Sequence, residues 1–198
     1  SQIDKVVLKN NSAEAGGGLY SFNSNPLITN SSIQNNHSIN GAGIFLELCS
    51  PNIENVEITD NNAISAGGGI YCGLSSYPEI IHVTISNNTG SHGGGILSTH
   101  GSQPVLSNSI LWNDSPNEIV SHPDSLIINF SNIQGGWEGT GNINQNPLFC
   151  MAVSGDYTLA ENSPCIGSGQ EGLNMGALGI GCLSINLPPT EFSLLNPE

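Results

Sequence analysis

Arginine is absent from this 198-residue chain, and lysine occurs only twice, as Lys5 and Lys9. Charged residues make up 9% of the sequence, and 16 Asp and Glu residues give a formal net charge of −14 at pH 7. Proteins bind nucleic acids and anionic lipids through Lys and Arg side chains that neutralise phosphates. The shortage of cationic side chains therefore argues against a nucleic-acid partner.

Long apolar runs are also missing from the sequence. No stretch approaches the roughly 18 apolar residues of a membrane-spanning helix, so no membrane insertion is expected. No segment keeps an apolar period of 3.6 residues, which predicts almost no helix. No Cys-x-x-Cys pair is present, which argues against a zinc site.

The abundant feature is a repeat built on glycine, proline and asparagine. Glycine-rich blocks, GGGLY, GAGIF, GGGIY and GGGIL, begin at Gly16, Gly41, Gly67 and Gly93. Prolines keep the same spacing of 25 to 27 residues, at Pro26, Pro51, Pro78 and Pro104. Two neighbouring columns are rich in asparagine, and we align them as Asn10, Asn35, Asn61, Asn87, Asn113 and as Asn11, Asn36, Asn62, Asn88, Asp114.

Short runs of alternating apolar residues lie between these columns, bounded by Gly, Pro or Asn, and predict short strands. A period of about 26 residues with several short strands predicts an all-β fold, a right-handed parallel β-helix. Successive coils of such a solenoid lie about 4.8 Å apart, so equivalent residues stack. We expect stacked turn glycines at Gly18, Gly43, Gly69 and Gly95, inward side chains at Ile44, Ile70 and Ile96, and hydrogen-bonded amides at Asn35, Asn61, Asn87 and Asn113.

The period decays after Asn113, which divides the chain into three parts. Residues 1–134 are expected to form the coils, residues 135–182 a loop-rich cap over the end of the stack, and residues 183–198 an extended tail or linker. The odd number of cysteines leaves at least one thiol unpaired within the chain. Three cysteines cluster late in the sequence (Cys150, Cys165 and Cys182), and this clustering predicts one disulfide that includes Cys165, with either of the others as its partner. Cys49 and Cys72 occupy different columns and are expected to lie too far apart to bridge.

The repeats resemble those of bacterial surface proteins related in fold to pectate lyases and polymorphic outer-membrane proteins. The segments SNIQGGWEGTGNINQNPLFC, GDYTLAENSPCIGSG and MGALGIGC are similar to the cap of large secreted bacterial β-helix proteins. The closing LPPTEFSLLNPE resembles the lead-in to a type IX secretion sorting domain. These resemblances imply an extracellular protein at the bacterial cell surface.

The residues do not favour catalysis, although many right-handed β-helices are polysaccharide lyases or hydrolases. A uronate lyase needs a cationic base, but the chain lacks Arg and has both lysines in the first coil. A hydrolase needs two carboxylates roughly 5 to 9.5 Å apart, and the aspartates do not pair in the coil register, where Asp60 is placed near Asn35 and Asn87. We therefore predict no catalytic, cofactor-binding or metal-ligating residues, and at most weak calcium binding by loop carboxylates.

Histidines and tryptophans are interpreted as structural or solvent-facing. The five histidines share no column: His37, His82, His92, His100 and His122. Trp112 and Trp137 could stack on sugars, but they lie beside the last strand and in the cap motif, where packing is the favoured interpretation.

The leading hypothesis is a non-catalytic structural module of the cell surface or matrix, whose partners are copies of itself, other surface proteins or glycans. The alternative is a carbohydrate-binding or polysaccharide-degrading protein, and a third reading is a spacer between binding domains. Because no helix or loop precedes the first coil, one hypothesis is head-to-tail self-association into a filament, and the equal alternative is that Ser1 is a processing boundary within a longer rod. The contacts would join Val6 and Leu8 of one subunit to Phe192, Leu194 and Leu195 of the next.

Overall fold

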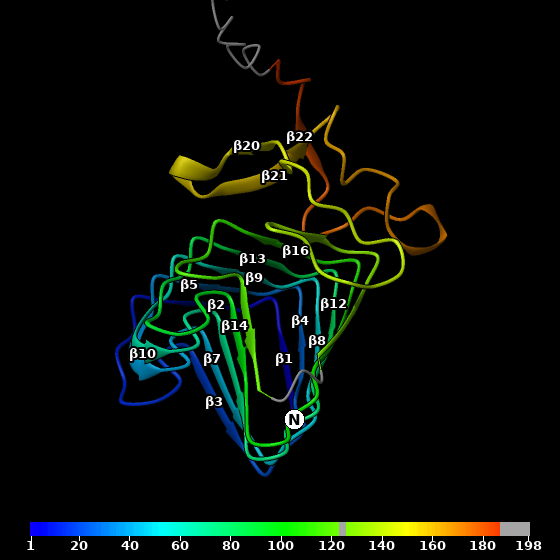
Figure 1. The fold of residues 1–198 in the computed structure, drawn as a ribbon. Helices are drawn as coiled ribbons and strands as arrows, with labels where there is room; N and C mark the ends of the chain where they lie inside the picture. The colour runs from blue at the N-terminus through cyan, green and yellow to red at the C-terminus, as the bar shows by residue number, and fades with distance from the viewer. Residues whose placement is uncertain (123–125, 187–198) are drawn as a thin grey trace, which may run out of the picture.

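The computed structural model describes residues 1–122 and 126–186 as a right-handed β-solenoid with a loop-rich segment along one side (Figure 1). Three parallel sheets run along the solenoid; each of the first five coils contributes one short strand to each sheet, and the chain then adds one more strand to two of them. Among the described residues the helical segments are two single turns of 3₁₀ helix (Ala152–Ser154 and Gln170–Gly172), and none is long enough to cross a bilayer.

The sheets are named here in the order in which the chain enters them. Sheet 1 contains β1 (Gln2–Asp4), β4 (Leu27–Thr29), β8 (Asn52–Glu54), β12 (Glu79–Ile81), β15 (Val105–Ser107) and β18 (Ile127–Asn129). Sheet 2 contains β2 (Val7–Lys9), β5 (Ser32–Gln34), β9 (Glu57–Thr59), β13 (Thr84–Ser86), β16 (Ile110–Trp112) and β19 (Asn132–Ile133). Sheet 3 contains β3 (Leu19–Phe22), β7 (Ile44–Glu47), β11 (Ile70–Gly73), β14 (Ile96–Ser98) and β17 (Ile119–Ser121). A further pair, β6 (His37–Asn40) and β10 (Asn62–Ala66), lies at the corner between sheets 2 and 3.

The core is a set of isoleucine columns, one behind each sheet. Ile44, Ile70 and Ile96 pair in register across sheet 3 and are fully buried. Branched side chains suit this position because they pack well on a pleated surface in one preferred rotamer. Full burial of each such side chain contributes about 1.5–3 kcal/mol relative to leaving it exposed.

The glycine column before sheet 3 exists because successive coils approach very closely there. A Cβ at Gly18 would lie 2.6 Å from the carbonyl oxygen of Gly43, and the same crowding repeats at Gly43, Gly69 and Gly95. Glycine is the only residue that permits this approach, so the predicted Gly columns mark where the chain enters sheet 3.

The two asparagine columns have different tasks. In one column the backbone takes the left-handed conformation, with φ between 53° and 66°, at Asn10, Asn35, Asp60, Asn87 and Asn113. The other column forms a hydrogen-bonded ladder along the axis, which is buried from its second rung onward: Asn11, Asn36, Asn61, Asn88 and Asp114. The predicted alignment therefore slips by one residue at Asn61, which belongs with Asn36 and Asn88, while Asp60 takes the turn position.

The cause of this slip is a bulge. β10 has one residue more than β6, and their register shifts between Ala63 and Ala66. The extra residue is absorbed after the ladder, so the sheets keep their register.

The segment after Ile133 does not remain over the end of the stack. Only its first part lies there: Phe130 N donates to Thr140 O and Ile133 N to Ile143 O, while Trp137 packs partly buried against the core. The remainder turns back along the outer face of sheet 2 and forms β20 (Phe149–Met151), β21 (Asp156–Ala160) and β22 (Ile180–Cys182). In Figure 1 these strands lie outside the solenoid, on the side formed by β16, β13 and β9 of sheet 2. We call residues 146–182 the side cap.

Candidate functional site

The side cap is attached to sheet 2 through a buried tyrosine. Tyr157 of β21 is 1% exposed, accepts a hydrogen bond from Asn87 Nδ2 at 2.7 Å and donates one to Asp60 Oδ2 at 3.3 Å. Asp60 and Asn87 are both turn residues of the left-handed column. Burial raises the pKa of Asp60, and the hydrogen bonds from Tyr157 and Asn87 oppose the rise. Burial also raises the pKa of Tyr157, and the carboxylate of Asp60 adds to it. The neutral hydroxyl is therefore the stable form.

A second acidic contact lies beside this one. Glu57 of β9 points outward from sheet 2, and burial raises the pKa of its carboxyl, with a further contribution from nearby Asp156. Glu57 borders an open cavity of about 340 Å³ together with Lys5 and Leu178. The sequence register gave no sign that Asp156 would approach Glu57, because the approach depends on the side cap.

An uncharged cavity of about 260 Å³ opens between the side cap and sheet 2. Trp112 and Phe149 provide its aromatic lining, and the amides of Asn87, Asn113 and Asn146 provide polar groups together with Ser86. Trp112 also packs against the apolar cluster beneath the cap, so it combines packing with a partly open position. A mixture of aromatic and amide groups without charge suits a neutral polar ligand.

An aromatic column runs across the outer face of sheet 3, and sequence reasoning missed it. Tyr20, Phe45 and Tyr71 occupy equivalent positions; ring centroids lie 5.3 Å apart for Tyr20 and Phe45 and 4.6 Å apart for Phe45 and Tyr71. The sequence did contain a sign of this column: an aromatic residue follows the inward Leu or Ile in each of these three coils. Because alternate residues of a strand face opposite sides of the sheet, these aromatic side chains must face outward. Phe45 is only 8% exposed because the rings stack on one another. The stacked rings therefore contribute to packing between successive coils.

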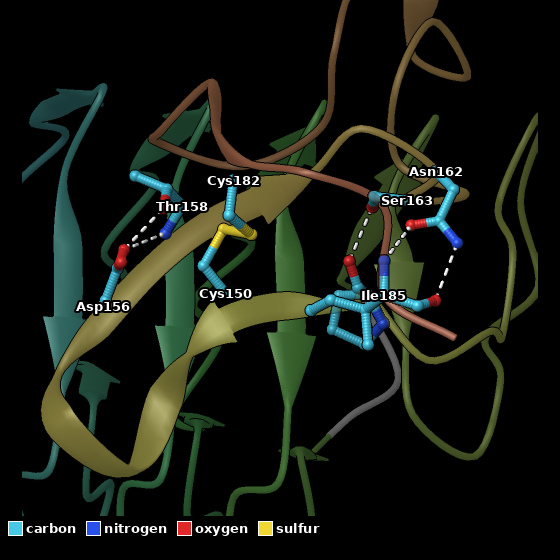
Figure 2. Close-up of a disulfide and its surroundings, with 8 residues drawn as sticks. Cys150, Asp156, Thr158, Asn162, Ser163, Cys182 and Ile185 are labelled. Atoms are coloured by element: carbon cyan, nitrogen blue, oxygen red, sulfur yellow. Dashed lines mark hydrogen bonds between the residues drawn. A yellow bond between two sulfur atoms is a disulfide. The ribbon is translucent and has the colours of Figure 1, made fainter. Parts of the chain in front are cut away.

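The disulfide joins Cys150 of β20 to Cys182 of β22, which lie on either side of β21 (Figure 2). The prediction that Cys165 takes part in the bridge was wrong. Cys165 is a fully buried thiol that packs beside Ile110 and accepts a hydrogen bond from Asn132 Nδ2 at 3.1 Å. Burial raises its pKa to about 11, against the hydrogen bonds from Asn132 and Ser163, so it is an unreactive core residue. Cys49 and Cys72 are free and buried.

No group of three or more His, Cys, Asp or Glu side chains is placed to hold a metal ion within residues 1–122 and 126–186. The predicted assembly residues divide between described and undescribed parts of the chain. Val6 and Leu8 are half-buried in the first coil, whereas Phe192, Leu194 and Leu195 lie outside the described residues.

The comparisons with known proteins concern the stack alone. The family described as "right handed beta helix region" matches residues 2–133, two thirds of the chain. No curated protein and no solved structure matches the chain. The matched segment ends at Ile133, the last residue of β19, and thus contains every strand of the three sheets. The chain belongs to the right-handed β-helix family.

Proposed function

We propose that this protein is a non-catalytic, extracellular structural rod of the bacterial cell surface or matrix. The observation that carries the proposal is the buried amide ladder. Asn36, Asn61 and Asn88 direct their side chains to one another and to the backbone, so these polar groups stiffen the stack and are unavailable to a substrate. The disulfide supports an oxidising location, because such bridges persist outside the cytosol.

The charged groups also support a non-catalytic role. A uronate substrate needs cationic neighbours, and the chain offers only Lys5 and Lys9, both in the first coil. Glu57 and Asp156 approach each other, but Asp156 is tied to Thr158 by two hydrogen bonds.

The direct test is incubation of the purified protein with pectin, alginate and related uronate polymers, with and without calcium. We expect no release of unsaturated sugars or new reducing ends. Product release that disappears in Glu57→Gln would contradict the proposal, and a heat-denatured sample provides the baseline.

Self-association is the second part of the proposal, with the first coil of one subunit meeting the C-terminal region of the next. Light scattering of the protein with and without residues 184–198 tests it. We expect larger species only with the tail present, and a full-length protein that stays monomeric at high concentration would exclude the filament.

Carbohydrate binding is a second candidate function, favoured by the uncharged cavity that Trp112 borders. Calorimetric titration with neutral oligosaccharides tests it, with Trp112→Ala as the disrupting variant. Tyr77→Ala is the matched control, because Tyr77 is an exposed aromatic residue, 48% accessible, that does not line this cavity. Binding that Trp112→Ala leaves unchanged would exclude this site.

A further inference from the structure

The ladder follows one bonding rule from coil to coil. At each rung the side-chain Oδ1 accepts from both the backbone N and the Nδ2 of the preceding rung, as Asn61 Oδ1 does from Asn36. In Asn36, Asn61 and Asn88 the Nδ2 makes a second bond to a backbone carbonyl of the preceding coil, as Asn61 Nδ2 does to Ile33 O. The rule therefore requires a donor at the Nδ2 position of every rung that follows another coil.

Asp114 occupies the last rung and lacks that donor. Its Oδ1 accepts from Asn88 N at 2.6 Å and from Asn88 Nδ2 at 2.9 Å, as the rule demands. Its Oδ2 takes the place of the amide nitrogen, is buried, and has no hydrogen-bond partner. Asp114 as a whole is 7% exposed. A carboxyl group can donate from this position only when it is protonated.

Glu118 takes the place of the next rung. Its Oε1 accepts from Asp114 N at 3.0 Å, the bond that a following Asn would receive from the backbone. Its Oε2 is buried without a partner, and the residue is 9% exposed. Each of the two carboxyl groups thus has one buried oxygen without a partner, and the two groups interact directly at the point where the ladder rule calls for a donor on Asp114 and an acceptor on Glu118.

No cationic side chain compensates this pair. The chain has no arginine, and its lysines lie at the opposite end of the stack, in the first coil. Within residues 1–122 and 126–186, the neutral hydroxyl of Tyr157 on the side cap is a further titratable group that interacts with Asp114. The histidines on adjoining segments, His92 and His122, are exposed.

The chain packs closely beside Asp114: a Cβ added at Gly95 would lie 2.8 Å from Asp114 Oδ2 and 2.5 Å from the Glu118 carbonyl oxygen. Among the described residues, Asp114 and Glu118 are not joined by a third His, Cys, Asp or Glu side chain that could complete a metal site. The positive charge that we assign to this pair is therefore a proton. Glu118 borders an open cavity of about 210 Å³ beside Gln134 and Trp137, which gives that proton a route to solvent.

We propose that Asp114 and Glu118 share one proton and form a pH-sensitive latch, which keeps the last coil of the stack, from β17 to β19, closed at acidic pH and loosens it as the pH rises. With the proton present, Asp114 supplies the missing donor and Glu118 the acceptor. Without it, two negative charges face each other in the protein interior, a state that is strongly unfavourable.

The pKa directions agree with this arrangement. Burial raises the pKa of Asp114 well above its ordinary value, and the neighbouring Glu118 carboxyl adds to the rise. Burial also raises the pKa of Glu118, against hydrogen bonds from Asp114. Because the native pair holds a proton that the unfolded chain releases near pH 4, its contribution to stability is complete below that pH and declines as the pH rises through the raised pKa.

The last coil is the part of the stack most able to respond. β17, β18 and β19 are the edge strands of their three sheets, so each pairs with only one strand of its own sheet. Elements with fewer neighbours open at lower free energy than the interior of a fold. Loss of the latch is therefore expected to open this coil before the coils that precede it.

Hydrogen exchange of the whole protein between pH 4.5 and 9, corrected for the intrinsic base-catalysed rate, tests the latch. We expect the opening constant of residues 113–122 and 126–134 to rise by up to about tenfold per pH unit, one proton's worth. Asp114→Asn restores the amide of the other rungs and should remove that pH dependence. Glu79→Gln, which removes an exposed carboxylate from β12, should keep it. An equal pH slope in wild type and Asp114→Asn would overturn the proposal.

A second measurement needs no variant. Carbon-detected NMR of the wild-type carboxyl groups should show one proton retained by this pair well above pH 4. Two carboxyls that both ionise in the ordinary range would overturn the latch even if Asp114→Asn failed to fold.

Discussion

The stack and the side cap both bury apolar and polar groups, but the stack repeats the same contacts in every coil whereas the side cap makes each contact once. In the stack, Ile44, Ile70 and Ile96 repeat one environment, and a loss in one coil is confined to its neighbours. In the side cap each contact occurs once: the Tyr157 hydroxyl, the Cys150–Cys182 bridge and the apolar cluster around Cys165. Repetition makes the stack readable from sequence, while the side cap depends on contacts between segments far apart in the chain.

The largest effect is expected in the stack. Ile70→Ala leaves a cavity between two coils and should lower the free energy of unfolding by about 2–5 kcal/mol, measured by denaturant titration. Ile64→Ala is the matched control, because Ile64 is 61% exposed and its truncation should cost less than about 0.5 kcal/mol. Similar losses for both variants would contradict the inward assignment of the column.

Removal of the disulfide should weaken the side cap while the stack remains folded. The bridge closes a loop with a sequence separation of 32, and its loss in Cys150→Ser/Cys182→Ser should cost about 3–4 kcal/mol of cap stability. Hydrogen exchange should rise in residues 146–182 and stay unchanged in β7, β11 and β14. A rise throughout the stack would show that the two regions unfold as one unit.

The smallest effect is expected from a Tyr→Phe substitution, which can be made at one buried and one exposed hydroxyl. Tyr157→Phe removes a buried hydroxyl that bonds Asn87 and Asp60, so it should destabilise the side cap by about 1–3 kcal/mol. Tyr20→Phe removes an exposed hydroxyl that bonds Glu47 and should be nearly neutral. Thermal unfolding of both variants measures the difference, and equal shifts would mean that Tyr157 does not hold the cap.

The sequence predicted the positions that repeat from coil to coil. The Ile and Gly positions lie where a constant spacing puts them, because parallel strands in register tolerate no slip. The alignment was wrong at Asn61, because the bulge in β10 changes the length of a corner without changing the sheets. Counting residues between asparagines cannot locate such a bulge.

The side cap was only partly predictable, for a different reason. Its motifs indicated a loop-rich segment, but its position on sheet 2 depends on Tyr157 reaching two turn residues more than 60 positions earlier. The disulfide partner likewise depends on how β20 and β22 lie beside β21. Cys165 was assigned to the bridge because nearness in sequence does not reveal which sulfur enters an apolar cluster.

The uniform rungs of the ladder have an evolutionary consequence. Each of these coils offers the following coil the same two donors, a backbone N–H and an amide N–H. The side-chain oxygen of the next asparagine accepts both, as the bonds between Asn36, Asn61 and Asn88 show. Duplication of a gene segment that encodes one such coil would therefore yield a chain whose new joints are already compatible. The length of such a solenoid can change by whole coils, while Asp114 and Glu118 keep their single copies at the last coil and the side cap keeps its single copy on the face of sheet 2.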